Sequence, residues 1–180
     1  MRTLTACLLL LPLAAQAGWR SVAGESTLEF VPSYEGTELP GRFGRFEVHF
    51  DFDPAAPAAA CLIVTVEAAS ADMDDADLNE GIAGPDFFHF AEFPTARFES
   101  RSVRAAGTGF VAAGELELKG SIQPVEVPFA WRREGGRAVM DGSLTLSRHA
   151  FGIGAGDWAQ DDTIGERVGV RFHVVLDETP

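Results

Sequence analysis

The sequence has few of the residues that cross-link a chain. Its 180 residues contain two cysteines, Cys7 and Cys61, and Cys7 lies in an apolar N-terminal segment. If that segment is a cleaved leader, the remaining chain has one thiol and cannot form an internal disulfide. Its stability must therefore come from a hydrophobic core, with Cys61 packed as an ordinary thiol at the start of a strand.

Basic residues are also scarce. Lysine and arginine number 14 against 27 acidic residues, which gives a formal net charge of -13. Binding to nucleic acid needs a basic surface, and so does an electrostatic hold on anionic lipid. The composition therefore argues against a nucleic-acid partner and favours a soluble, acidic surface.

No apolar run is long enough to cross a membrane, and the longest lies at the N-terminus. A short positive start, Met1-Arg2-Thr3, precedes the apolar run from Ala6 to Ala14, and Ala15-Gln16-Ala17 fits a cleavage site. We therefore predict a signal peptide over residues 1–17, a mature domain over 18–180 and a periplasmic location. A lipoprotein is disfavoured, because the apolar run follows Cys7 instead of preceding it.

Signatures of catalysis and metal binding are missing as well. No Gly-x-Ser-x-Gly sequence occurs, and the aspartates from Asp72 to Asp77 lack the glycine and glutamate of a calcium loop. We read these acids as a solvated helix start. Four histidines fall on separate predicted elements without ligand spacing: His49, His89, His149 and His173. The sequence thus predicts a protein that is not an enzyme, with no catalytic residue, no metal site and no required cofactor.

The sequence is rich in segments where apolar and polar residues alternate. Phe46, Val48, Phe50 and Phe52 alternate with charged or polar neighbours, as in a strand with one buried face. The same pattern recurs over 62–66, 116–118, 125–131 and 168–176, with Gly or Pro turn signals between the segments. These segments predict antiparallel strands with one wet face.

The segment from Ser70 to Gly84 breaks this pattern. Leu78 and Ile82 are four residues apart, acids precede them, and Gly84-Pro85 follows. This arrangement predicts one short helix with acids at its N-terminal turn. About eight strands with short connections and a single helix predict an all-β fold, an eight-stranded antiparallel barrel. The pattern leaves open whether side chains or a slender ligand fill the interior.

Five of the fourteen phenylalanines lie between Phe87 and Phe98. This run and other segments resemble, in order and spacing, the YceI-like family of exported, lipocalin-like proteins, several of which bind polyisoprenoid chains. The resemblance covers about residues 19–177 and rests on these segments: Gly41-Arg42-Phe43-Gly44-Arg45-Phe46, Val64-Thr65-Val66-Glu67-Ala68-Ala69-Ser70, Asp86-Phe87-Phe88, Phe93-Pro94-Thr95-Ala96-Arg97-Phe98, Gly114-Glu115-Leu116-Glu117-Leu118-Lys119-Gly120 and Arg148 with Phe151-Gly152-Ile153-Gly154.

The resemblance implies a periplasmic carrier that holds a polyisoprenoid lipid or a ubiquinone-like molecule in an apolar tunnel. The segment Gly154–Asp162 is similar to that of a subgroup associated with b561-type membrane cytochromes, which implies a cytochrome partner. The alternative is a packed, non-catalytic barrel whose acidic surface docks to such a cytochrome or to a stress-response partner. A lidded barrel of this kind can also form a homodimer.

The candidate ligand-binding residues are apolar, apart from Arg148, and either Arg148 or Arg97 is expected to meet the ligand head group. Packing of each aromatic ring into a solid core is the competing interpretation, and Gly152, Gly154 and Gly156 mark either a tunnel mouth or a bulged strand. Phe87 and Phe88 are expected to point inward, and Arg97 and Glu99 outward. The candidates are Phe43, Phe46, Phe50, Leu78, Ile82, Phe87, Phe88, Phe98, Phe129, Trp131, Phe151, Trp158 and Arg148.

Overall fold

The alternating segments form a closed antiparallel barrel in the computed structural model, which describes residues 18–160 and 163–179. The signal peptide predicted at residues 1–17 lies outside the described part. The prediction of an eight-stranded antiparallel barrel with one helix is confirmed. Between residues 95 and 147, strands that follow one another along the chain are also neighbours in the barrel, joined by short turns.

Seven strands follow one another around most of the barrel: β6 (Phe46–Asp51), β7 (Cys61–Glu67), β9 (Thr95–Ala106), β10 (Gly109–Leu118), β11 (Ser121–Glu134), β12 (Arg137–Ser147) and β13 (Arg167–Thr179). The ring closes through β1 (Gly18–Ser21), which pairs with β13 on one side and β6 on the other. Closure leaves no sheet edge along this part of the barrel.

The first strand of the barrel is interrupted. After β1 the chain turns and continues as β2 (Thr27–Val31), which pairs with β13 and with β5 (Gly41–Phe43). The Ser26 hydroxyl bridges the break, because its Oγ accepts from the Val175 N–H at 3.1 Å and donates to the Val22 carbonyl at 3.0 Å. The short β8 (Ala71–Asp72) extends β7 and pairs with β5, and β3 (Ser33–Tyr34) and β4 (Thr37–Glu38) form a separate hairpin.

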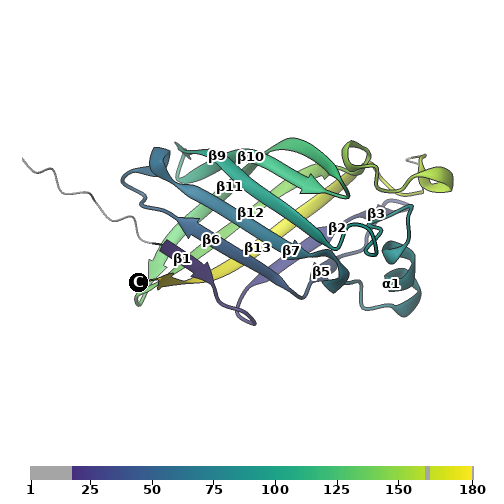
Figure 1. Ribbon diagram of the computed structural model, residues 1–180, viewed down its shortest axis with the longest axis horizontal. Coiled ribbons are helices and arrows are strands. Elements are labelled where there is room, and N and C mark those ends of the chain that lie inside the picture. The colour runs from purple at the N-terminus through teal and green to yellow at the C-terminus, as the bar shows by residue number, and fades with distance from the viewer. Residues whose placement is uncertain (1–17, 161–162, 180) are drawn as a thin grey trace, which may run out of the picture.

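The helix α1 (Ala76–Ala83) lies at one end of the elongated barrel, and β1 and the C-terminus lie at the other (Figure 1). The Asp75 carboxylate caps α1 by accepting from the N–H groups of Asp77 and Leu78, and the helix ends at Gly84. Four short 3₁₀ helices complete the described chain: η1 (Pro57–Ala59), η2 (Ala68–Ser70), η3 (Arg148–Phe151) and η4 (Gly156–Trp158).

The helix is shorter than the segment predicted for it. Asp72 and Asp74 precede α1, and both accept hydrogen bonds from Arg42 at 2.7 Å. Asp72 also accepts from the Asn79 side chain, and this bond, with the Asp74 N–H and the Arg42 charge, lowers the pKa of its carboxyl. These two acids are solvent-exposed, as expected, but they precede the helix and hold the approach to α1 against β5 through Arg42.

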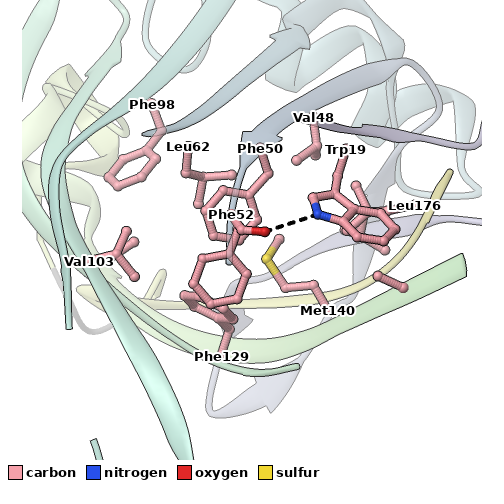
Figure 2. Packing of buried hydrophobic residues seen from close by; sticks show 13 residues of the cluster. Trp19, Val48, Phe50, Phe52, Leu62, Phe98, Val103, Phe129, Met140 and Leu176 are labelled. Atoms are coloured by element: carbon pink, nitrogen blue, oxygen red, sulfur yellow. Dashed lines mark hydrogen bonds between the residues drawn. The ribbon is translucent and has the colours of Figure 1, made fainter. Parts of the chain in front are cut away.

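Aromatic side chains fill the end of the barrel that carries the termini. The Phe50 and Phe52 rings stack with centroids 4.5 Å apart, and Trp131 meets the Phe52 ring edge-on at 4.9 Å. The indole N–H of Trp19 donates to the Phe52 carbonyl at 3.1 Å (Figure 2). We call this cluster the aromatic plug: Trp19, Phe50, Phe52, Phe110, Phe129 and Trp131.

A bulge between β9 and β10 brings two backbones unusually close. Ala113 pairs with Ser102 but Gly114 pairs with Ser100, so Arg101 is the extra residue. A Cβ on Gly114 would collide with the Glu99 carbonyl and the Ser100 Cα, both backbone atoms. By contrast, a Cβ on Gly81 in α1 would have no neighbour within 4 Å.

Replacing these two glycines should change stability in opposite directions. Gly114→Ala should lower the free energy of unfolding by about 3 kcal/mol, because the β9–β10 backbones must separate. Gly81→Ala should raise it by about 0.5–1 kcal/mol, because alanine favours the helix and nothing obstructs it. Urea denaturation of both variants measures these values. A neutral Gly114→Ala would contradict the close approach at the bulge.

Candidate ligand-binding site

A cavity of about 430 Å³ occupies the barrel between the aromatic plug and α1. Its wall in the middle of the barrel consists of branched aliphatic side chains on the inward faces of four consecutive strands: Leu116, Leu118, Val125, Val127, Leu144, Leu146, Val168 and Val170. An eight-stranded barrel is just wide enough for large side chains to fill it. The aliphatic side chains here are smaller than the rings of the plug, and space remains.

The two ends of the interior therefore differ. Phe50, Phe129 and Trp131 pack against one another in the aromatic plug and do not line the cavity. The expectation of ligand contact at these three residues is thus corrected, because their rings close the end of the barrel. The sequence left open whether side chains fill the interior of the barrel. Aromatic rings fill one end of it, and the other end is hollow.

The helix and the phenylalanine run cover the hollow end. Phe88 is buried and contacts the rings of Phe30 and Phe43, with centroids 5.7 and 6.0 Å away. Ile82 from α1 packs into the same cluster. Phe87 and Phe88 both line the cavity, so the predicted inward orientation of this pair is confirmed.

Large apolar side chains gather where the cavity meets the surface. Tyr34, Leu78 and Trp158 all line the cavity, and they are 42%, 39% and 37% exposed. They come from the β3–β4 hairpin, α1 and η4, and Trp158 lies 6.0 Å from the Phe87 ring. Partly exposed lining residues on three separate segments mark the mouth of the cavity.

Arg148 organises the loop that carries Phe151 and Trp158. Its side chain is 3% exposed, and its guanidinium donates to five carbonyl oxygens at 2.8–3.2 Å: Nε to Gly165, Nη1 to Ile153 and Gly154, and Nη2 to Gln160 and Ile164. A guanidinium has five N–H donors. All of them have a carbonyl partner, so the side chain serves to fold the loop.

The glycines of this loop belong to turns at the mouth. Gly152, Gly154 and Gly156 all have positive φ, between 61° and 70°, which glycine adopts without strain. The segment therefore forms 3₁₀ turns and is not a bulged strand. Phe151, Ile153 and Trp158 of this segment line the cavity.

The other cations near the cavity already have partners. Arg97 Nη1 donates to Glu99 Oε2 at 2.5 Å on the outer face of β9, and this bond, followed by the Arg97 charge, lowers the pKa of the Glu99 carboxyl. Both residues therefore face outward, as predicted. Lys119 Nζ donates to the Gly152 carbonyl at 2.7 Å, and burial lowers the pKa of this ammonium against the opposing charge of Asp86.

The structure brings most of the sequence-predicted site residues together. Ten of them line the cavity: Phe43, Phe46, Leu78, Ile82, Phe87, Phe88, Phe98, Phe151, Trp158 and Arg148. Three further lining residues were not among the candidates predicted from the sequence: Phe30, Tyr34 and Phe172. The alternation over 168–176 had nevertheless placed Phe172 on the inward face. For Tyr34 no periodic signal existed, because its hairpin leaves the barrel wall.

Within residues 18–160 and 163–179, no group of three or more histidine, cysteine or acidic side chains is arranged to hold a metal ion. In the same ranges, none of the helices has the length and apolar character needed to span a bilayer.

The chain forms a closed barrel with an apolar cavity, which opens to the surface at the end covered by the helix. This arrangement is typical of a lipocalin-like fold. The YceI-like domain family matches residues 19–176, and the chain belongs to that family. A UPF0312 protein of Shewanella sp. is 33% identical over 156 residues, with 81% of this chain and 82% of the relative covered. A UPF0312 protein of Pseudomonas paraeruginosa is 35% identical over 121 residues, and the match spans 63% of that relative's length.

Solved structures agree on the fold. BcnA of Burkholderia cenocepacia superimposes with a TM-score of 0.83 at 30% identity, over 86% of this chain and 98% of that protein. A polyisoprenoid binding domain from Saccharophagus degradans, implicated in plant cell wall breakdown, gives a TM-score of 0.68 at 16% identity, over 89% and 98% of the two chains. At that identity the second similarity concerns the barrel alone.

Arg148→Lys tests the role of this buried arginine. Lysine has three donors on a single nitrogen and cannot reach carbonyls spread over Ile153–Gly165, so several buried acceptors lose their partner. We expect the free energy of unfolding to fall by about 3 kcal/mol and amide exchange in residues 149–160 to accelerate, as read by hydrogen–deuterium exchange.

Arg104→Lys is the matched control, because the Arg104 side chain is 55% exposed and pairs with Glu126 on the barrel surface. It should cost no more than about 0.5 kcal/mol. Equal effects of the two substitutions would show that Arg148 does not organise the loop.

Proposed function

We propose that this protein is an exported, non-catalytic carrier that holds the isoprenoid tail of a polyisoprenoid lipid or quinone in its cavity. The observation that carries the proposal is the chemistry of the wall, which presents aliphatic and aromatic side chains along the hollow half of the barrel. Transfer of a hydrocarbon from water into such a wall is worth about 0.8 kcal/mol per CH₂. A long tail therefore needs no specific polar contact.

The mouth and the plug support an end-on mode of binding. Rings close the barrel at the terminal end, so a tail enters past Leu78 and Trp158 and stops at the plug. The polar head of the lipid stays at the mouth, where exposed side chains and water can solvate it. The solved Saccharophagus degradans protein with the same barrel fold is a polyisoprenoid binding domain, which supports this ligand class.

The alternative, a packed barrel that only docks to a membrane cytochrome of the b561 type or a stress-response partner, is less well supported. It requires a filled interior, and about 430 Å³ of this interior is open. A carrier could also use such a cytochrome as its partner, or form a homodimer. Both stay predictions of the sequence resemblance.

Leu146→Trp tests whether the cavity binds the tail. Leu146 lines the cavity from β12, so an indole there fills space that the ligand needs. Organic extraction of the protein purified from its native host, followed by mass spectrometry, should recover a polyprenyl species from the wild type and at least tenfold less from the variant.

Ile122→Trp provides the control, because Ile122 is 60% exposed and lies outside the cavity lining. It should retain the lipid at the wild-type level. Repeated recovery of no isoprenoid from the wild type, or equal recovery from Leu146→Trp, would overturn the proposal.

A further inference from the structure

The polar side chains at the mouth of the cavity differ in charge and in availability. Three charged residues take part in the lining of the cavity in the described part of the chain: Asp77, Arg97 and Arg148. The guanidinium donors of Arg148 are committed to five carbonyls, and Arg97 is bonded to Glu99 on the outer face of β9. Neither cation is therefore placed to receive a ligand head group.

The Asp77 carboxylate is at the mouth itself. Asp77 and Gly81 are four residues apart on α1 and thus share one face of the helix, next to the face of Leu78 and Ile82. All four line the cavity. Asp77 is exposed. The space beside Gly81 is open, because a Cβ added to this glycine would have no neighbour within 4 Å. A head group held at the mouth would meet this charge.

The start of α1 could otherwise attract an anion, because free N–H groups there bind phosphate. In this chain the Asp75 carboxylate accepts from the N–H groups of Asp77 and Leu78, at 3.0 Å each. The capping side chain thus occupies these donors and adds a second negative charge. The other side of the mouth carries Asp157, which precedes Trp158, and Asp86, which lies beside Gly156 and is opposed by the Lys119 ammonium.

We infer that the mouth selects lipids whose head group carries no negative charge, with Asp77 as the residue that sets this selectivity. Polyprenols and quinones meet this requirement, and polyprenyl phosphates do not. The inference rests on the proposed function, because it concerns the head of a lipid whose tail occupies the cavity. Selectivity arises from repulsion by carboxylates in a mouth where the nearby cations are already bonded.

Two probes with the same tail test the inference, geranylgeraniol and geranylgeranyl phosphate. The delipidated wild-type protein should bind the alcohol at least about tenfold more tightly at low salt and pH 8, where the phosphate carries nearly two charges. The difference should narrow at 1 M NaCl, because the Debye length falls to about 3 Å. Equilibrium dialysis with labelled lipids measures both affinities.

Asp77→Asn keeps the shape of the side chain and removes its charge. Affinity for the phosphate should rise about three- to tenfold and affinity for the alcohol should not change, as expected from one charge at the mouth. Glu80→Gln is the matched control, since it removes the same charge from the same helix at a residue that does not line the cavity. It should change either affinity less than twofold.

Three outcomes would overturn the inference, and they have different meanings. Equal binding of both lipids by the wild type would show that the mouth does not select by charge. Equal effects of Asp77→Asn and Glu80→Gln would remove the role of Asp77 and leave only the net charge of the protein. Failure of the alcohol itself to bind would contradict the proposed function, and the inference with it.

Discussion

Closure of the barrel is the constraint on which the rest of the structure depends. Once β1 pairs with both β13 and β6, every inward side chain competes for one interior of fixed width. Where rings pack against one another across that interior, as Phe50 and Phe52 do, it is solid. Where it receives Leu144, Val127 and similar residues, it is hollow. The aliphatic side chains in the middle of the barrel therefore leave a cavity that the aromatic plug closes at one end.

The hollow end needs a cover that leaves an opening. Two segments of the chain form this cover: α1 with the phenylalanine run that follows it, and the loop held by Arg148. The first contributes Leu78 and Phe88, and the second contributes Phe151 and Trp158. Arg148 bonds carbonyls from both arms of its loop, so the shape of the mouth depends on one buried guanidinium. A charged group at the wall of an apolar cavity is tolerated because all its donors are satisfied.

The charge at the mouth and the apolar wall have different roles. In the proposed function the apolar wall supplies affinity for a tail without regard to the head, because each buried CH₂ contributes similarly. Discrimination between lipids must then come from the mouth. There, Asp77 is exposed, and the guanidinium groups of Arg97 and Arg148 are hydrogen-bonded within the protein. The proposed function and the inferred selectivity thus assign affinity and selectivity to different parts of the molecule, so that a substitution can change one without the other.

The sequence by itself determined the barrel, the short helix before the phenylalanine run and most of the lining residues, because alternation with period two fixes which side chains face inward. It could not separate Phe50, Phe129 and Trp131 from Phe46, since all four share that inward pattern. Their positions along the barrel axis depend on strand register and tilt, which arise only on closure. The role of Arg148 was equally hidden, because its five carbonyl partners come together only when the loop folds. Tertiary structure alone decided where the barrel is solid, where it is hollow and which charged side chain lies at the opening.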